Sequence, residues 1–229
     1  MSTMSPDSTF KGPSLVDSTA APPLSRQAWA LLCSAYLSQF VASSFFYMAM
    51  TAILRSRGVP LEQLGWIYLL GIVPGFKFLW APVLDRYGFG RRGHFGIWLA
   101  LMQALLIITL LWLGTLPMAP DQPLPLAALV TGCLLIALLT SVQDIAADGL
   151  SCRLLGPAQR GLGNALQMAC GMLGFAAGGG GVLIMVEHWG WQPALWSLTA
   201  LNTLTLIQAL AWREPAHAQP APHERLSIP

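Results

Sequence analysis

The sequence predicts an all-α membrane protein with six transmembrane helices, and its composition and its run of apolar spans are the reasons. Of the 229 residues, 55% are hydrophobic and only 10% are charged, with a mean hydropathy of +0.58. Soluble domains carry roughly 25% charged residues, so this chain is depleted in them. A helix of about 20 apolar residues crosses the hydrocarbon core of a bilayer, and the chain contains a series of spans of that length.

These spans follow one another and are joined by short polar segments. We expect membrane helices at Ala28–Leu54, Leu64–Leu84, Phe95–Leu116, Leu126–Leu150, Leu162–Val186 and Pro193–Trp212. Pro74 and Lys77 interrupt the second span, and a proline inside a helix removes a backbone hydrogen bond and kinks it. Residues 1–25 are polar and rich in Ser, Thr and Pro, which indicates a disordered cytosolic tail and no signal peptide. The predicted membrane domain is therefore 26–213, and 214–229 form a second polar tail.

The basic residues are distributed unevenly between the two sets of connecting segments. With the N-terminus in the cytosol, the inner segments hold Lys11, Arg26, Arg86, Arg91, Arg92, Arg153, Arg160, Arg213 and Arg225, and the outer ones hold Arg55 and Arg57. Because Lys and Arg accumulate on the cytosolic side of membrane proteins, we expect both termini in the cytosol. The predicted location is a bacterial-type inner membrane.

Several classes of function are not indicated. A net charge of +2 and the absence of a basic run longer than Arg91-Arg92 argue against nucleic acid as a partner. No catalytic, nucleotide-binding or metal-binding motif is present, so we predict no enzyme, no cofactor and no metal. The cysteines lie in or beside apolar spans without CxxC spacing, and we interpret Cys33, Cys133, Cys152 and Cys170 as free thiols.

Polar residues in the second half of the fourth span are the first candidates for a functional site. Asp144 and Asp148 are four residues apart and share one helix face, with Gln143 beside them. One interpretation is a solvated inner helix end whose acids pair with Arg153 or Arg160. The other is a cytosolic gate or proton-coupling site, because an intramembrane acid facing a cavity is a functional candidate.

Lys77 in the second span is the matching basic candidate. Its side chain either extends to the inner membrane surface, pairs with Asp144, or contacts an anionic substrate. On the first span, Tyr36, Gln39, Ser43 and Tyr47 are candidates to line a cavity, and they can equally well form hydrogen bonds to neighbouring helices.

Small residues recur one turn apart on the fifth span. The pairs are Gly174 with Gly178 and Ala177 with Gly181. Such a face lets helix backbones approach closely, so we expect helix packing there. The alternative is a flexible segment that bends during a transport cycle.

The segment Gly75–Arg92, GFKFLWAPVLDRYGFGRR, resembles the loop between the second and third helices of major facilitator superfamily transporters. The matching positions are Asp85, Arg86, Gly88, Arg91 and Arg92, with Ala81 in place of the first glycine and Phe89-Gly90 inserted. In that family the loop locks the cytosolic side through charge pairs, so the resemblance implies a cytosolic latch at these five residues.

A narrower resemblance concerns the substrate. KFLWAPVLDRY at 77–87 and SVQDIAADGLSCRLL at 141–155 resemble muropeptide permeases and acetyl-coenzyme A transporters. GPAQRGLGNALQMACGMLGFAAGGG at 156–180 is closer to siderophore importers of the pyochelin and rhizobactin type. The resemblance implies proton-coupled uptake of a small solute, with a ferri-siderophore first and a muropeptide or acyl-coenzyme A compound as alternatives.

The same resemblance implies an architecture. Six spans correspond to the N-terminal half of a major facilitator fold, built as a 3+3 inverted repeat, with residues 214–229 as a cytosolic tail or the start of a central linker. The expected partners are the lipid bilayer, protons, the solute, and either a missing second half or a second copy of the chain. The rival hypotheses are a non-transporting assembly or regulatory membrane protein and an inactive remnant.

Overall fold

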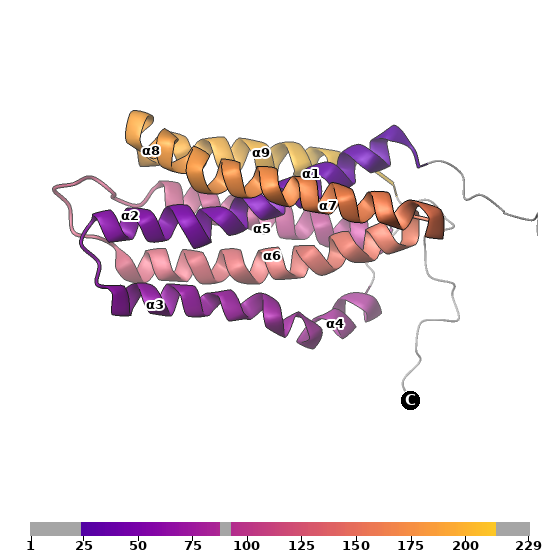
Figure 1. Cartoon of the computed structure of the whole chain (residues 1–229), viewed down its shortest axis with the longest axis horizontal. Helices are drawn as coiled ribbons and strands as arrows, with labels where there is room; N and C mark the ends of the chain where they lie inside the picture. The colour runs from indigo at the N-terminus through magenta and orange to yellow at the C-terminus, as the bar shows by residue number, and fades with distance from the viewer. Residues whose placement is uncertain (1–23, 88–92, 214–229) are drawn as a thin grey trace, which may run out of the picture.

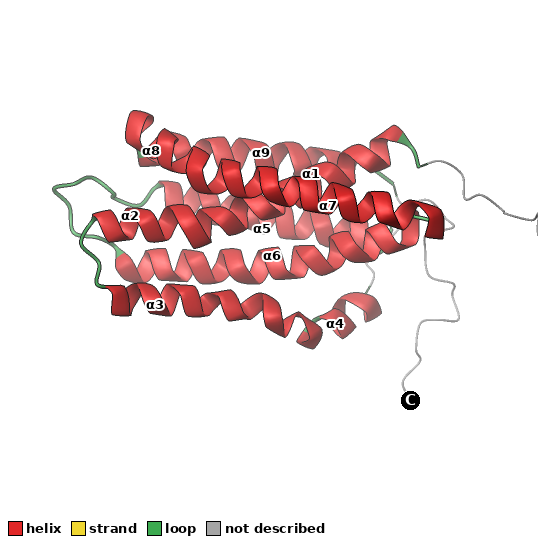
Figure 2. Cartoon of the chain, in the orientation of Figure 1, coloured by secondary structure: helices red, strands yellow, loops and turns green. Residues whose placement is uncertain are grey.

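The computed structural model describes residues 24–87 and 93–213, which form an elongated bundle of helices running along its long axis (Figure 1). Within these residues the chain is helix and loop, with no strand (Figure 2). The tails predicted at 1–25 and 214–229 lie outside the described residues, apart from Leu24 and Ser25.

The helical elements follow one another with short connections. They are α1 (Arg26–Ser44), the π-helical turn η1 (Phe45–Met50), α2 (Thr51–Ser56), α3 (Leu61–Leu69), the 3-10 segment η2 (Leu70–Leu79), α4 (Ala81–Arg86), α5 (Phe95–Gly114), α6 (Leu126–Leu154), the 3-10 turn η3 (Pro157–Gln159), α7 (Arg160–Phe175), the π-helical turn η4 (Ala176–Gly181), α8 (Val182–Trp189) and α9 (Trp191–Ala211).

Five continuous helices in the described part of the chain are long and apolar enough to cross a membrane. They are Arg26–Ser56, Phe95–Gly114, Leu126–Leu154, Pro157–Trp189 and Trp191–Ala211. Each corresponds to one of the predicted spans and exceeds it or differs from it by a few residues at its ends.

The second predicted span is interrupted, as Pro74 predicts, and the interruption divides it into three segments rather than only kinking one helix. The chain there passes through α3, η2 and α4, with a break at Trp80 between the last two. Pro74 lies inside η2 and cannot donate a backbone hydrogen bond, which disfavours a continuous α-helix. Pro82 lies in the first turn of α4, where a missing N–H costs little because that group has no helical acceptor.

The packing order follows from which helices contact one another. α5 packs against α6 and α9, and α1 lies between α6, α7 and α9. The segment α3–η2–α4 runs along the edge of the bundle, where η2 contacts α6 (Figure 1). α1 begins and α9 ends at the same end of the bundle, and the α2–α3 connection lies at the other.

The closest helix contact that requires glycine is between α1 and the continuous segment formed by α7 and η4. A β-carbon at Gly178 would overlap the backbone carbonyl of Val41, and one at Gly174 would overlap Phe40. The Ser44 hydroxyl adds a hydrogen bond of 2.8 Å to the carbonyl of Gly174. The predicted packing of Gly174 and Gly178 is thus confirmed.

The second predicted glycine pair does not take part in this contact. Ala177 is exposed, and the nearest atom to a β-carbon at Gly181 would be the carbonyl of Ala176 in its own segment. The π-helical turn η4 covers both positions and lies against η1, so the fifth span is irregular where the sequence allows a bend.

The buried side chains form two apolar clusters, one toward each end of the bundle. One includes Phe45 and Leu110, and the other includes Leu31 and Phe95. On α1, α5 and α6, polar residues occupy the stretch between the clusters, and we call them the polar layer: Ser38, Gln39, Gln103, Gln143 and Asp144. Apolar packing holds the bundle on both sides of this layer, which fixes its side chains in place.

Candidate functional site

An ion pair between Lys77 and Asp144 forms the centre of the candidate site. Lys77 Nζ lies 3.0 Å from Asp144 Oδ2, so the pair predicted from the sequence is present. Gln39 Nε2 donates a hydrogen bond of 2.7 Å to the other carboxylate oxygen, Oδ1. Asp144 on α6 is therefore held from η2 on one side and from α1 on the other.

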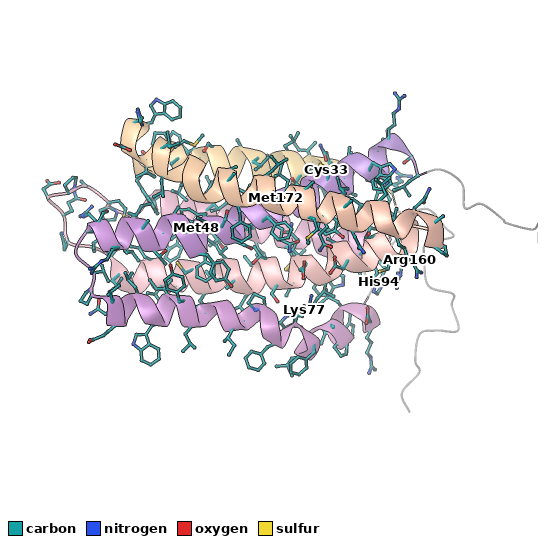
Figure 3. The ribbon with its side chains drawn as sticks, in the orientation of Figure 1. Cys33, Met48, Lys77, His94, Arg160 and Met172 are labelled. Atoms are coloured by element: carbon teal, nitrogen blue, oxygen red, sulfur yellow. The ribbon has the colours of Figure 1, made fainter. Side chains whose placement is uncertain are left out.

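The two partners of the ion pair differ in exposure. The Lys77 side chain is 49% exposed and that of Asp144 is 20% exposed, while Gln39 is buried. Lys77 lies on the 3-10 segment η2, which contacts α6 (Figure 3). Asp144 lies in a helix long and apolar enough to cross a membrane, where a charge is costly unless it is paired, and Lys77 supplies that pairing. A lysine ammonium has three donors, and its open side leaves it able to bind a second anionic group.

The break in the second span places Lys77 at this position. No residue of η2 is fully buried, because this segment contacts the bundle mainly through α6. Just after η2, the indole Nε1 of Trp80 donates a hydrogen bond of 3.3 Å to Ser141 Oγ on α6. This hydrogen bond ties Trp80, three residues after Lys77, to Ser141, which lies about one helical turn before Asp144 on α6.

The second acid of α6 has a separate set of partners. Asp148 Oδ1 accepts hydrogen bonds from the Tyr36 hydroxyl at 3.1 Å and from Gln167 Nε2 at 3.2 Å. These contacts join α6 to α1 and α7. Among the described residues the acids form one ion pair, Lys77–Asp144, and none with Arg153 or Arg160. The guanidinium of Arg153 lies over the Phe95 ring, 4.3 Å from its centre.

Gln143 faces away from the ion pair and into the core. Its Nε2 donates to the Ala35 carbonyl at 3.1 Å and to Ser38 Oγ at 3.4 Å. Gln103 Nε2 also donates to Ser38 Oγ, at 2.6 Å. The Ser38 hydroxyl in turn donates to the Ala35 carbonyl at 3.1 Å. Ser38 thereby joins α5 and α6 to α1, which gives Gln143 a contact that stabilises the bundle.

Sequence reasoning missed Ser38 and Gln103 as parts of the polar layer. A signal was available for Gln103, because it is an amide inside the otherwise apolar span Phe95–Leu116. Its burial with a hydrogen-bond partner on another helix is the usual way in which such a group is accommodated. Ser38 gave no comparable signal, since serine is common in membrane helices.

Three of the four residues predicted to line a cavity on the first span form hydrogen bonds to neighbouring segments, and the fourth, Ser43, forms none within the described part of the chain. Tyr36 and Gln39 bind the two acids, as described above, and the Tyr47 hydroxyl donates to the Gly71 carbonyl at 3.3 Å. Ser43 is half-buried. A cavity of about 850 Å³ lies at the α2 end of the bundle, and none of these four residues lines it. Its charged lining residues are Arg57 and Glu187.

The predicted latch is described only in part. Asp85 and Arg86 are exposed on α4, and Gly88, Arg91 and Arg92 lie outside the described residues. Within the described ranges no group of three or more His, Cys, Asp or Glu side chains could hold a metal ion. All four cysteines are free, as the sequence predicted.

Comparison with known proteins relates this chain to membrane permeases. It is 34% identical over 169 residues to the anhydromuropeptide permease of Escherichia coli strain K12, an alignment covering 72% of this chain and 33% of the permease. It is 27% identical over 163 residues to an uncharacterized protein of Haemophilus influenzae, covering 71% of this chain and 37% of that protein. The chain thus spans about a third of the length of these relatives.

Residues 28–227, most of the chain, match the model of the family described as the Major Facilitator Superfamily. The match includes all five helices that are long and apolar enough to cross a membrane, and these indicate a multi-pass membrane protein. The all-helical bundle agrees with the half fold expected from the sequence. This chain belongs to the Major Facilitator Superfamily, a family of membrane transporters.

Proposed function

We propose that this chain takes part in the proton-coupled uptake of a small anionic solute, and that the Lys77–Asp144 pair is where solute and proton act. The observation that supports this proposal most strongly is a half-exposed ammonium that pairs, at 3.0 Å, with a carboxylate on a helix long enough to cross a membrane. A purely structural ion pair in a membrane bundle would be expected to lie fully inside the protein.

The pair suggests a simple coupling scheme. Protonation of Asp144 would remove its charge and weaken its contact with Lys77, because a neutral carboxyl attracts an ammonium less than a carboxylate does. The released ammonium would then bind a carboxylate of the solute. Asp148, held by Tyr36 and Gln167, is the second acid proposed to take up or pass on a proton.

A muropeptide is the solute class that we favour. The relative at 34% identity is an anhydromuropeptide permease, and a peptide-bearing sugar carries carboxylates that suit a lysine ammonium. A ferri-siderophore is the second candidate, and the resemblance of residues 156–180 to siderophore importers favours it.

We also propose that α3–η2–α4 is a sixth, broken membrane crossing. Interrupted helices frequently form the binding sites of transporters, and Lys77 lies in the interrupted part. The chain would then be the N-terminal half of a major facilitator fold, itself built as a 3+3 inverted repeat, in a bacterial inner membrane with both termini cytosolic. A second half or a second copy would complete the pathway, and the latch of Asp85, Arg86, Gly88, Arg91 and Arg92 would close against it.

Uptake into right-side-out membrane vesicles with an acid exterior tests this proposal. We expect radiolabelled anhydromuropeptide to accumulate only in vesicles that contain the protein, and an excess of ferri-siderophore to leave this uptake unchanged. Asp144→Asn should abolish the accumulation, and Asp121→Asn, in an exposed loop, should not. Uptake no greater than in vesicles without the protein would contradict transport and favour an assembly or regulatory role.

A further inference from the structure

Two thiols from distant parts of the sequence are in contact in this bundle. Cys33 Sγ on α1 lies 3.6 Å from Cys170 Sγ on α7, although 137 positions separate the residues. The Cys170 thiol also lies 3.6 Å from the carbonyl oxygen of Cys33. Neither Cys133 nor Cys152 has such a thiol neighbour among the described residues.

The helix packing holds these thiols together. One residue beyond Cys170, a β-carbon at Gly171 would lie 3.4 Å from the Phe40 ring of α1. Further along, Gly174 and Gly178 allow the backbones of α1 and α7 to touch. α1 and α7 therefore cannot separate locally without losing this glycine contact, and the two cysteines stay within reach of each other.

We propose that Cys33 and Cys170 are a modification site that forms a disulfide between α1 and α7 when a lipid-soluble oxidant reaches it. The two S–H bonds break and one S–S bond forms. Two electrons pass to the oxidant, either one two-electron acceptor such as a quinone or two one-electron acceptors such as copper(II) complexes, and two protons are released. Because an S–S bond is about 2.05 Å long, the sulfur atoms must approach by about 1.5 Å, which side-chain rotation can supply.

The exposure of the two cysteines defines the class of oxidant. Cys33 is half-buried, whereas Cys170 is only 3% exposed. Cys33 lies in the membrane-length helix Arg26–Ser56 and Cys170 in Pro157–Trp189, so in a bilayer the pair would be surrounded by hydrocarbon and protein. An oxidant that partitions into the bilayer can reach Cys33 first, and a charged hydrophilic oxidant cannot.

Oxidation of the 229-residue chain in its membrane tests the proposal. The membranes are treated with copper(II)-phenanthroline, dissolved in detergent with N-ethylmaleimide, and digested for mass spectrometry. We expect a disulfide-linked peptide pair containing Cys33 and Cys170, two hydrogen atoms lighter than the reduced peptides and lost on treatment with dithiothreitol. Cys152, which is exposed, should remain available to N-ethylmaleimide and serves as the internal control.

Two further arms make the result specific. Cys170→Ser should abolish the linked peptide, and Cys133→Ala, which removes a buried thiol without a thiol neighbour, should retain it. Hexacyanoferrate(III), a membrane-impermeant oxidant, should leave the pair reduced. Full alkylation of Cys33 and Cys170 after copper(II)-phenanthroline treatment of the wild-type chain would overturn the proposal, as would equal oxidation by hexacyanoferrate(III).

Discussion

At the scale of single residues, Lys77 differs from the polar layer that it contacts, because about half of its side chain is exposed. Gln103 and Gln143 point into the protein and bind Ser38, so their hydrogen bonds serve the bundle. Lys77 instead binds Asp144 from the edge segment η2. We therefore distinguish Ser38, Gln103 and Gln143, whose hydrogen bonds stabilise the bundle, from the Lys77–Asp144 pair, which we propose is available to a solute.

Replacing the lysine should affect solute binding. In Lys77→Gln the charge is lost, and a hydrogen bond to a charged group contributes about 1.5–3 kcal/mol, so we expect muropeptide affinity to fall roughly tenfold to a hundredfold. Lys77→Arg keeps the charge and should retain most of the binding. Equilibrium binding of labelled muropeptide to membranes measures the affinity of both variants. Unchanged affinity in Lys77→Gln would exclude Lys77 as a solute contact.

Replacing the serine should affect stability. Ser38→Ala leaves the buried Gln103 amide without its acceptor and removes one of the two acceptors of Gln143, and an unsatisfied buried group costs about 1–3 kcal/mol. Ser43→Ala is the matched control, because Ser43 is only half-buried on the same helix. Denaturant unfolding in detergent should show the loss for Ser38→Ala alone, and equal midpoints for both variants would disprove this role.

At the scale of elements, the contact of α1 with α7 and the interruption of the second span have different origins. The first follows from glycines that remove side chains at the crossing point, at Gly174 and Gly178. The second follows from prolines that prevent one continuous helix, at Pro74 and Pro82. Small residues thus bring α1 together with α7 and η4, while prolines interrupt the α3–η2–α4 segment beside the ion pair.

The glycine contact can be tested by comparing two alanine variants in the same segment, one at the contact and one two residues away that meets nothing. Gly178→Ala places a methyl group against the backbone of Val41, and overpacking of this kind costs about 1–3 kcal/mol. Gly180→Ala meets nothing within 4 Å and should be neutral or slightly stabilising. Thermal unfolding in detergent should show a lower midpoint only for Gly178→Ala; the reverse order would argue against the described crossing of α1 and α7.

At the scale of the whole molecule, the helices run in alternating directions along the bundle, and this decides which connections lie at each end. The first and last described helices meet at one end of the bundle, and the α2–α3 connection, which carries Arg57, lies at the other (Figure 1). The positive-inside rule predicts that the first of these ends is cytosolic.

Labelling with a membrane-impermeant maleimide tests this orientation. Cys152, exposed near the end of α6, should react in inside-out vesicles and remain unlabelled in intact cells. A Ser56→Cys variant, at the exposed end of α2, should react in intact cells. The opposite pattern at both positions would mean that the predicted orientation is inverted.

Much of the bundle could be predicted from the sequence because membrane helices are specified by length and hydropathy. The start of α6 at Leu126 and the packing of Gly178 both follow from local patterns, whereas the end of α6 at Leu154 lies four residues beyond the predicted Leu150. The contact between Cys33 and Cys170 could not be predicted, because it depends on the register of two helices 137 positions apart. The position of the break at Trp80 was not predicted either, because Pro74 indicates that the helix is interrupted but not where the next helix begins.

The candidate site was predictable in part for the same reason. A charge inside an apolar span is conspicuous, so Lys77 and Asp144 stood out, and their opposite signs suggested a pair. The partners of Asp148 are neutral, and a neutral residue such as Gln167 gives no sign of which neighbour it binds. Likewise, the inward orientation of Gln143 depends on the three-dimensional position of Ser38.

The most direct test of the central claim, that the Lys77–Asp144 site couples solute to protons, is the movement of protons that accompanies the solute. Anhydromuropeptide is added to lightly buffered right-side-out vesicles, and the external pH is recorded. The account predicts a rise in external pH as solute and protons enter together, and no rise with Asp144→Asn. Uptake without a pH change, or a pH change that persists in Asp144→Asn, would contradict it.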